Sequence, residues 1–422
     1  MARDDGVRKL EIGDLEKAVT GSAAAFRCRR RLQPAGGQGD KVFPPTFAGA
    51  VYALERRRIA KREEPVPCVL LDSVQSQANR MELALQEAVD AEKIKLPLLV
   101  VDFSEHAPTG DIEADKEAGK LIDAVGKVTS LQLPHRLADA ILRDSEWDGV
   151  AFRKSDKGKT LNTMSIVNAT PLFELCPTAL VFGMWDSTGP KGGLGAKFER
   201  AMVSETVGVG AEVGDLRRGV RSDPLQIRAA VQVLKAGDRS LLRVAEPKER
   251  GAVAPSEIVH SSIPFPKQKD KKTDKNSYDG VTIEYAEQTT TLSLICLRRL
   301  RFPVNGTTTK GADGAARTVL AALGLCAATL AFESGTSHRS RSLLWPDGPM
   351  NWELLDHPGE TPEKFSLSAD GAIGLLSAAI ARAKTAKLPW AEDPIVLKPS
   401  KELIKLVRLS QLEATKEEPE AG

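Results

Sequence analysis

Aromatic residues are scarce in this 422-residue sequence: they make up 5% of it, and only three of them are tyrosines. The shortage disfavours a protein that holds RNA by stacking bases on aromatic rings. The five histidines form no HxH or HExxH pattern, and the five cysteines form no CxxC pair. We therefore expect no metal site and no cofactor. An odd number of widely spaced cysteines is typical of reduced thiols in a cytoplasm.

Long hydrophobic runs are also missing. The longest candidate, residues 319–332, is too short to cross a bilayer, and the charged N-terminus has no apolar core of a signal peptide. We expect a cytoplasmic protein without a membrane partner. A hydrophobic fraction of 41% is that of an ordinary globular protein, and the net charge is only +2. Any surface for nucleic acid must therefore be a patch that acidic regions balance elsewhere.

The most informative stretch of the sequence is residues 65–92. An apolar run over 66–71 predicts a buried strand, and Asp72-Ser73-Val74-Gln75 predicts the start of a helix. Apolar residues at three- and four-residue spacing form one stripe of this helix, and its other face is polar. The stripe contains Val74, Ala78, Met81, Leu85 and Ala88, and the polar face contains Gln75, Ser76, Asn79 and Arg80.

Amide, hydroxyl and guanidinium groups on that face donate hydrogen bonds to phosphates and sugars. A helix N-terminus also attracts anions. The alternative interpretation is that these groups satisfy neighbouring backbone inside the fold.

Two further segments are basic. A strand over 26–34 places Arg27, Arg29 and Arg31 on one face, which suits either a phosphate backbone or a solvated edge strand. A helix over 133–144, opened by Pro134, carries His135 and Arg136 in its first turn. A third basic segment around 56–62 is expected to be a helix with a solvated face.

A strand over 180–185 is expected to lead into a glycine-rich basic loop, 186–200, with Lys191, Lys197 and Arg200. The loop fits neither the Walker pattern nor the dinucleotide fingerprint. Its flexibility and charge suit a polyphosphate backbone, and a plain long connection is the alternative.

A long β-type segment over 283–302, a helix over 313–333 and a basic loop over 334–345 repeat the layout around Gln75. Two such units predict an α+β fold with a split β-α-β sheet of the ferredoxin-like or RRM-like plan. The wide spacing requires insertions, which we place near 104–130, 186–220 and 262–281 of a single domain spanning 1–422. A helical C-terminal part is expected over 364–412, with helices near 368–387 and 401–412.

Seven segments, in this order along the chain, resemble the backbone subunit of a type I-G (formerly I-U) CRISPR Cascade complex, a member of the RAMP superfamily. The resemblance covers about residues 32–345, and LDSVQSQANR is its most specific part. The segments are LQPAGG…FPPTF, LDSVQSQANRMELAL, LPHRLADAILRDS, ALVFGMWDS, KFERAMVSE, RSDPLQI and SHRSRSLL.

The resemblance implies an RRM-like palm with finger and thumb insertions, and copies stacked along a CRISPR RNA that base-pairs with target DNA. Other partners would be a large subunit and a Cas5/Cas6-like subunit. The protein would not be a nuclease. The candidate RNA contacts are Ser73, Gln75, Ser76, Gln77, Asn79, Arg80, Arg29, Arg31, His135, Arg136, Lys191, Lys197, Arg200, Arg339 and Arg341.

Two other functions stay open. One is a RAMP-type endoribonuclease that processes CRISPR RNA, with His135 or His338 as general acid or base. It would need a tyrosine, a lysine or a second histidine close to that histidine, and none of the three tyrosines is close to either histidine in sequence. The other is a scaffold protein that binds no nucleic acid.

Overall fold

The computed structural model describes residues 6–48, 51–187, 189, 195–214, 224–227, 230–235, 242–246, 249–258 and 280–416. Its largest sheet is antiparallel except for the pair β1–β22 at one edge. In spatial order the strands are β1 (Val7–Lys9), β22 (Glu363–Ser366), β21 (Asn351–Leu355), β2 (Ala25–Pro34), β18 (Tyr285–Ser293), β13 (Met202–Val209), β6 (Val66–Asp72) and β5 (Leu54–Arg57). A short hairpin, β19 (Thr336–Ser337) and β20 (Leu343–Pro346), joins the sheet through β20 and β2.

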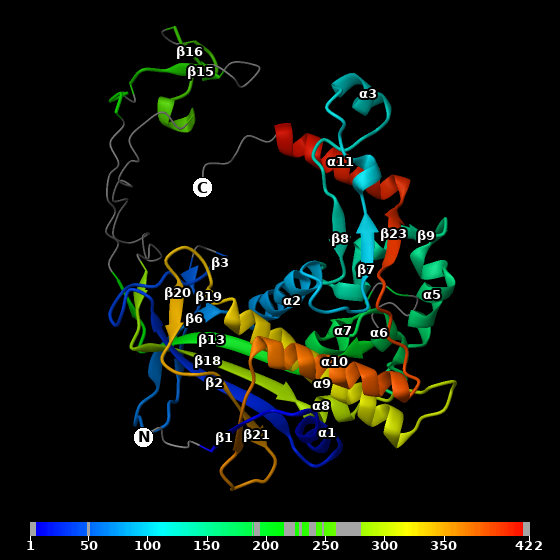
Figure 1. The fold of residues 1–422 in the computed structure, drawn as a ribbon. Helices are drawn as coiled ribbons and strands as arrows, with labels where there is room; N and C mark the ends of the chain where they lie inside the picture. Colours follow the sequence, from blue (N-terminus) through cyan, green and yellow to red (C-terminus); the bar gives the residue numbers. More distant parts are fainter. Residues whose placement is uncertain are drawn as a thin grey trace.

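Four helices pack together on one face of this sheet (Figure 1). They are α1 (Ile12–Thr20), α2 (Val74–Asp90), α9 (Lys310–Glu333) and α10 (Ala369–Thr385). Helix α9 contacts the other three and is buried along most of its length. The helix is longer than the apolar run 319–332, so, contrary to our expectation, it is long and apolar enough to span a membrane by composition. However, 78% of its most apolar window is buried inside the protein. Because α9 is buried on all sides, it has no polar face.

A second sheet lies on the other side of these helices from the main sheet (Figure 1). Its strands come from two distant parts of the chain: β23 (Ile395–Pro399) pairs in parallel with β7 (Leu99–Asp102). The order is β10 (Val150–Ala151), β9 (Ser145–Trp147), β23, β7 and β8 (Lys127–Thr129). Helices α3 (Ile112–Glu117) and α11 (Lys401–Lys416) belong to the same region. The C-terminal part is thus not purely helical as expected over 364–412, because β22 and β23 lie at its start and within it.

Short elements complete the described chain. The short strands are β3 (Thr46–Phe47), β4 (Val51–Tyr52), β11 (Met184–Trp185), β12 (Lys197–Phe198), β14 (Glu212–Val213), β15 (Val233–Lys235), β16 (Leu242–Val244) and β17 (Val281–Thr282). The short α-helices are α4 (Ala140–Arg143), α5 (Asp156–Lys159), α6 (Thr170–Leu175), α7 (Thr178–Phe182) and α8 (Leu294–Arg298).

One split β-α-β unit is present in the main sheet. Strands β18 and β20 both run antiparallel to β2, which lies between them, and α9 connects them along the chain. The unit around α2 differs, because β13, the next strand of the sheet, is the antiparallel neighbour of β6. The fold is therefore mixed α and β with one of the two expected units in the expected form.

Several local expectations were correct. The strand predicted over 26–34 is β2, and the helices predicted over 74–88, 313–333, 368–387 and 401–412 are α2, α9, α10 and α11. Each has a strong local signal: alternation in β2, and side-chain caps such as Ser73, Thr309 and Ser368 before the helices.

Other expectations were wrong. The apolar run predicted as a strand over 180–185 is divided between the end of helix α7 and the two-residue strand β11, and every residue of α7 is buried. A short buried run has no polar face, so its periodicity does not distinguish helix from strand. The basic segment predicted as a helix contains strand β5 instead, which pairs with β6. The helix predicted over 133–144 is a 3₁₀ turn, Arg136–Ala138, followed by α4.

Candidate nucleic-acid interface

The junction of β6 and α2 is built around a buried carboxylate, Asp72, whose exposed fraction is 1%. Three side chains of α2 donate to it: Ser76 Oγ at 2.7 Å, Gln77 Nε2 at 2.6 Å and Arg80 Nε at 3.0 Å. Ser73 caps the helix, because its Oγ accepts from the backbone N–H of Ser76 at 3.3 Å. Polar groups at this helix start therefore satisfy one another and the buried acid.

The hydrogen-bonded chain continues from Gln77 into the sheet. Gln77 Oε1 accepts from Gln288 Nε2 on β18 at 2.7 Å and from Ser204 Oγ on β13 at 2.9 Å. Arg30 Nη1 on β2 donates to Gln288 Oε1 at 3.2 Å. Gln77 is only 3% exposed, so the structure gives this candidate RNA contact an interior role.

The outward stripe of α2 has different residues. Gln75 and Asn79 are exposed one turn apart, and Leu83, 55% exposed, follows after another turn. The two amides thus stay available to a ligand outside the protein.

Arg80 fastens the loop between β19 and β20 onto α2. Its Nη1 donates to the carbonyl of Ser337 at 3.3 Å and its Nη2 to the carbonyl of His338 at 2.8 Å. With Nε bound to Asp72, each guanidinium nitrogen donates to a group of the protein, although the side chain is 34% exposed. Arg80 therefore links helix α2 to the β19–β20 loop.

The same loop contains one buried histidine and two arginines. The imidazole of His338 is 2% exposed, with Nδ1 3.8 Å from Asp72 Oδ2, and burial lowers its pKa to about 4. Arg341 is exposed and its guanidinium lies 4.4 Å from the centre of the Phe43 ring. Among the described residues, no carboxylate lies within 4 Å of Arg339 or Arg341.

On the other flank of α2 lies a pocket of about 530 Å³, which we call the Trp185 pocket. The indole of Trp185 is 52% exposed, and Lys197 Nζ lies 5.7 Å from the centre of its ring. The pocket brings together four residues that the sequence singled out in two separate segments. Its lining is Pro134, His135, Arg136, Gly183, Met184, Trp185, Ser187, Lys197, Phe198, Glu199 and Arg200.

A buried ion pair joins this pocket to α2. Arg136 Nε and Nη2 each donate to a carboxylate oxygen of Glu82 at 2.7 Å, and Nη1 donates to the Gly183 carbonyl at 3.0 Å. The two side chains are 9% and 3% exposed. Burial raises the pKa of Glu82, and the hydrogen bonds from Arg136 oppose this shift. Arg136 therefore holds the fold together and is not free for a phosphate.

Gly183 is required at the wall of the pocket. Its φ is +82°, and a Cβ at this position would lie 2.8 Å from Cγ of Arg200. Arg200 packs against this glycine and donates from Nε to the carbonyl of Phe182 at 3.2 Å. The rest of its guanidinium remains at the surface, because the residue is exposed.

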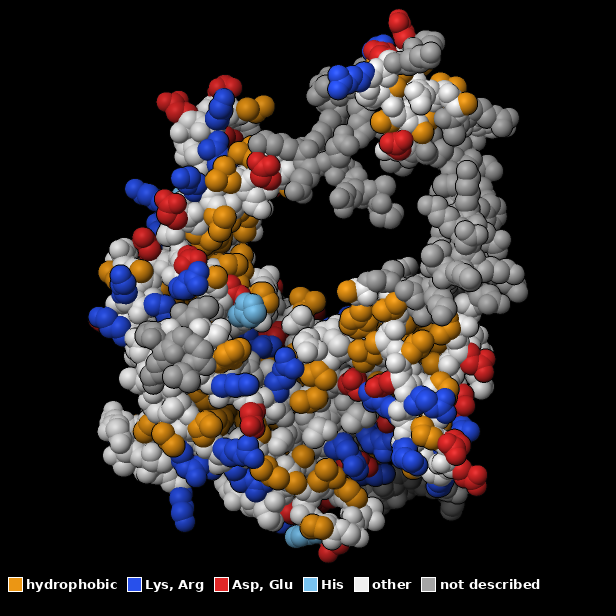
Figure 2. Space-filling view, turned by 180° about the vertical axis from the view of Figure 1, so that it is seen from behind, with side chains coloured by type: hydrophobic (Ala, Val, Ile, Leu, Met, Phe, Trp, Pro, Cys, Tyr) orange, Lys and Arg blue, Asp and Glu red, His pale blue; other side chains and the backbone are white. Residues whose placement is uncertain are grey.

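The arginines of β2 alternate as expected but face carboxylates on neighbouring strands and turns. Arg27 is 2.8 Å from Glu353, Arg29 is 2.6 Å from Glu287, and Arg31 is 3.6 Å from Asp347. Figure 2 shows one face of the molecule, on which Lys and Arg side chains are interspersed with Asp and Glu. The open face of β2 thus resembles a solvated sheet surface with balanced charge.

Sequence reasoning missed Trp185 and Asp72. Trp185 precedes a glycine-rich basic loop, and an exposed indole at that place was the available signal. The burial of Asp72 depends on strands that are distant in sequence, so it had no local signal. Lys191 lies outside the described residues, and the described residues contain no group of three or more potential metal ligands.

Comparison with known proteins gives one family. No curated protein matches the chain. Residues 26–213 match the family described as CRISPR-associated protein GSU0053. This segment runs from β2 to β14 and includes α2 and the Trp185 pocket, whereas α9 and the β19–β20 loop lie outside it. Over this part, the chain is similar to a CRISPR-associated protein family, which suggests a role in CRISPR defence.

Proposed function

We propose that this chain is the RNA-binding backbone subunit of a CRISPR effector complex, of the type I-G Cascade kind. In this proposal α2 faces the sugar-phosphate chain of the guide RNA. The observation that carries it is the placement of two basic loops on the two flanks of α2, each fastened by an arginine that is bound to a buried carboxylate.

Ion pairing separates the candidate residues into two groups. Arg29, Arg31, Arg80 and Arg136 have carboxylate partners within 4 Å. Among the described residues, Lys197, Arg200, Arg339 and Arg341 have none. A cation without a protein counter-ion gains most from a phosphate, because no existing pair has to be broken. The second group, with Gln75 and Asn79 between the two flanks, is our candidate RNA contact surface.

These contacts suit the backbone of RNA more than its bases. Phosphate contacts fix position without reading sequence, and target recognition then comes from base pairing between guide RNA and target DNA. The exposed indole of Trp185 adds one aromatic platform that any base can use. Affinity should accordingly be uniform across guide sequences.

The remaining parts of the proposal follow the family resemblance. Several copies would stack along one guide RNA in the cytoplasm, beside a large subunit and a Cas5/Cas6-like subunit. The main sheet would be the RRM-like palm of a single RAMP-type domain. The second sheet, with α3 and α11, is our candidate for an inserted finger or thumb.

We propose binding without catalysis. A general acid or base must reach the scissile phosphate, whereas the imidazole of His338 is buried beside Asp72. His135 is exposed, and the described lining of its pocket contains Lys197 but no tyrosine or second histidine, so His135 is the residue at which the endoribonuclease is tested. Repeat RNA incubated with wild type, His135→Ala or His338→Ala should stay equally intact; cleavage that depends on either histidine would favour the endoribonuclease.

The main test compares two charge reversals. We expect Lys197→Glu with Arg200→Glu to weaken binding of a fluorescent single-stranded RNA at least about tenfold, since each charge-assisted contact is worth ~1.5 kcal/mol or more. Lys364→Glu is the control, because Lys364 is exposed on β22, near the opposite edge of the sheet from β6. Equal affinities of the variants, or a loss confined to one guide sequence, would contradict the proposal.

A second variant tests the outer stripe of α2. Gln75→Ala with Asn79→Ala removes only exposed amides, so the fold should be unchanged while RNA affinity falls. An unchanged affinity would remove α2 from the interface and leave the scaffold interpretation for this helix.

A further inference from the structure

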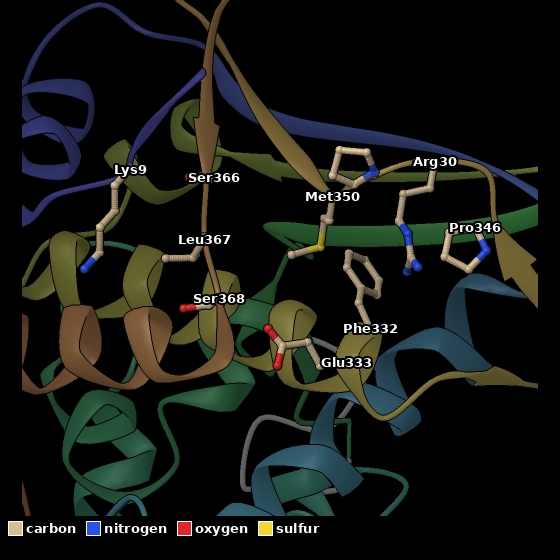
Figure 3. A pocket seen from close by; sticks show the side chains of 11 residues that line it. Lys9, Arg30, Phe332, Glu333, Pro346, Met350, Ser366, Leu367 and Ser368 are labelled. Carbon is tan, nitrogen blue, oxygen red and sulfur yellow. The ribbon is translucent and has the colours of Figure 1, made fainter. Parts of the chain in front are cut away.

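A second pocket lies on the side of the main sheet where β1, β20 and the start of α10 meet (Figure 3). Its volume is about 640 Å³, and we call it the Arg30 pocket. Apolar side chains form much of its wall, and two cations, one carboxylate and two serines line the rest. The lining is Lys9, Arg30, Phe332, Glu333, Pro346, Gly348, Pro349, Met350, Ser366, Leu367 and Ser368.

Arg30 is unusual because it is buried without a counter-ion. The residue is 8% exposed, and among the described residues no carboxylate lies within 4 Å of its guanidinium. Nη1 donates to the neutral amide of Gln288, while Nε is buried without any hydrogen-bond partner. Burial lowers the pKa of Arg30, which reflects the cost of keeping this charge away from water.

The ring of Phe332 compensates only part of that cost. The guanidinium carbon of Arg30 lies 4.8 Å from the ring centre, and Figure 3 shows the two side chains next to each other at the pocket. A buried cation normally has a carboxylate partner, because an unpaired charge in a poorly solvated site is destabilising. The unused Nε and the pocket beside it leave room for an anion from outside.

The other charged groups of the pocket support this reading. Lys9 is exposed, and among the described residues no carboxylate lies within 4 Å of its ammonium group. Glu333 is the acidic residue of the lining, and its Oε1 accepts from the backbone N–H of Ala369 at 2.6 Å. The carboxylate of Glu333 therefore interacts with the first turn of α10 and not with Lys9 or Arg30.

We propose that the Arg30 pocket binds an oxyanion, a carboxylate or a phosphate, carried on an apolar body. Arg30 would hold the charged group, since a guanidinium edge matches such oxygens, whereas Lys9 lies at the other end of the pocket (Figure 3). Phe332, Met350 and Leu367 would cover the apolar part. This site is separate from the candidate RNA contact surface around α2, and it does not rest on the proposed function.

Small probes test the proposal directly on the full chain by titration calorimetry. Phenylacetate is compared with phenylacetamide, which has the same shape without the charge, and phenyl phosphate with inorganic phosphate, which lacks the apolar body. We expect phenylacetate or phenyl phosphate to bind, and the tighter of the two identifies the source of the oxyanion. Phenylacetamide that binds as tightly as phenylacetate, or no binding of either anion, would overturn the proposal.

Two variants locate the binding. Lys9→Gln is the control: it removes an exposed cation at the other end of the pocket from Arg30 and should leave the affinity for the anion as in wild type. Arg30→Met, with its fold checked by circular dichroism, should weaken the bound anion at least about tenfold, the value of one charge-assisted hydrogen bond. If this variant does not fold, the comparison of phenylacetate with phenylacetamide on the wild-type chain decides. Unchanged affinity in a folded Arg30→Met overturns the proposal. The affinity of Lys9→Gln for RNA should equal that of wild type. If Lys9→Gln loses RNA affinity and the wild-type chain binds neither anionic probe, the proposal is overturned and the pocket belongs to the RNA path instead.

Discussion

At the scale of single residues, the polar face of α2 has two uses. Asp72 collects Ser76, Gln77 and Arg80 inside the protein, whereas Gln75 and Asn79 point away from it. Residue type alone did not separate these uses, because the same amides and guanidinium suit a buried network and a phosphate. Charge reversal at Arg80 would place a carboxylate against Asp72, so any loss of RNA binding would report a damaged fold.

His338 makes stability depend on pH. Its pKa is about 4 in the folded protein against an ordinary 6.5, so the unfolded chain binds a proton first as pH falls. Neutral His338 therefore makes its full contribution to the free energy of unfolding above pH 6.5. This contribution is lost as the pH falls toward 4, at about 1.4 kcal/mol per pH unit. Urea unfolding at pH 7 and pH 5 should show this slope in wild type and a shallower one in His338→Gln. Replacing the exposed His357 by Gln is the control, and equal slopes in both variants would refute the assignment.

At the scale of elements, α2 is the helix on which two distant loops are fixed. Arg80 holds the β19–β20 loop, and Arg136 holds the turn before α4 together with the backbone after α7. Both arginines bind a buried carboxylate close to α2, Asp72 at its start and Glu82 within it. The position of the Trp185 pocket relative to α2 therefore depends on one buried pair.

Removing one partner of that pair should be more harmful than removing both. Arg136→Met leaves the carboxylate of Glu82 buried without a counter-charge and should lower the free energy of unfolding by about 3–5 kcal/mol. The double variant with Glu82→Leu removes both charges and should recover most of that loss. Urea unfolding of the two singles and the double gives the coupling energy. A double variant as unstable as the sum of the singles would show that the pair is not coupled.

The sequence predicted those elements whose signals are local. Capping by Ser73, the stripe of α2 and the alternation of β2 were all readable within one segment. The wrong predictions, α7 and β5, are short segments whose state is decided by what packs or pairs with them. The contacts of Gln77 with Ser204 and Gln288 join residues 127 and 211 positions apart, so no local pattern announces them. The candidate site was thus predicted by residue type, and its division into inner and outer groups required the fold.

At the scale of the whole molecule, charge is nearly balanced. The net charge is +2, and many arginines on the main sheet are paired with carboxylates, such as Arg29 with Glu287 and Arg57 with Glu205. Such a surface gives little long-range attraction for nucleic acid. If the chain binds RNA as proposed, the attraction must come from the few unpaired cations that flank α2, and it must be short in range.

The salt dependence of RNA affinity measures how many such cations take part. Each phosphate contact on a single strand contributes about 0.7 to the slope of log K against log salt concentration. Lys197→Glu with Arg200→Glu should therefore reduce the magnitude of the slope by about 1.4, which is two contacts. Lys364→Glu, exposed and far along the sheet, should leave the slope as in wild type. A slope that falls equally in both variants would mean that the binding follows net charge, and the two flanks of α2 would then have no special part in it.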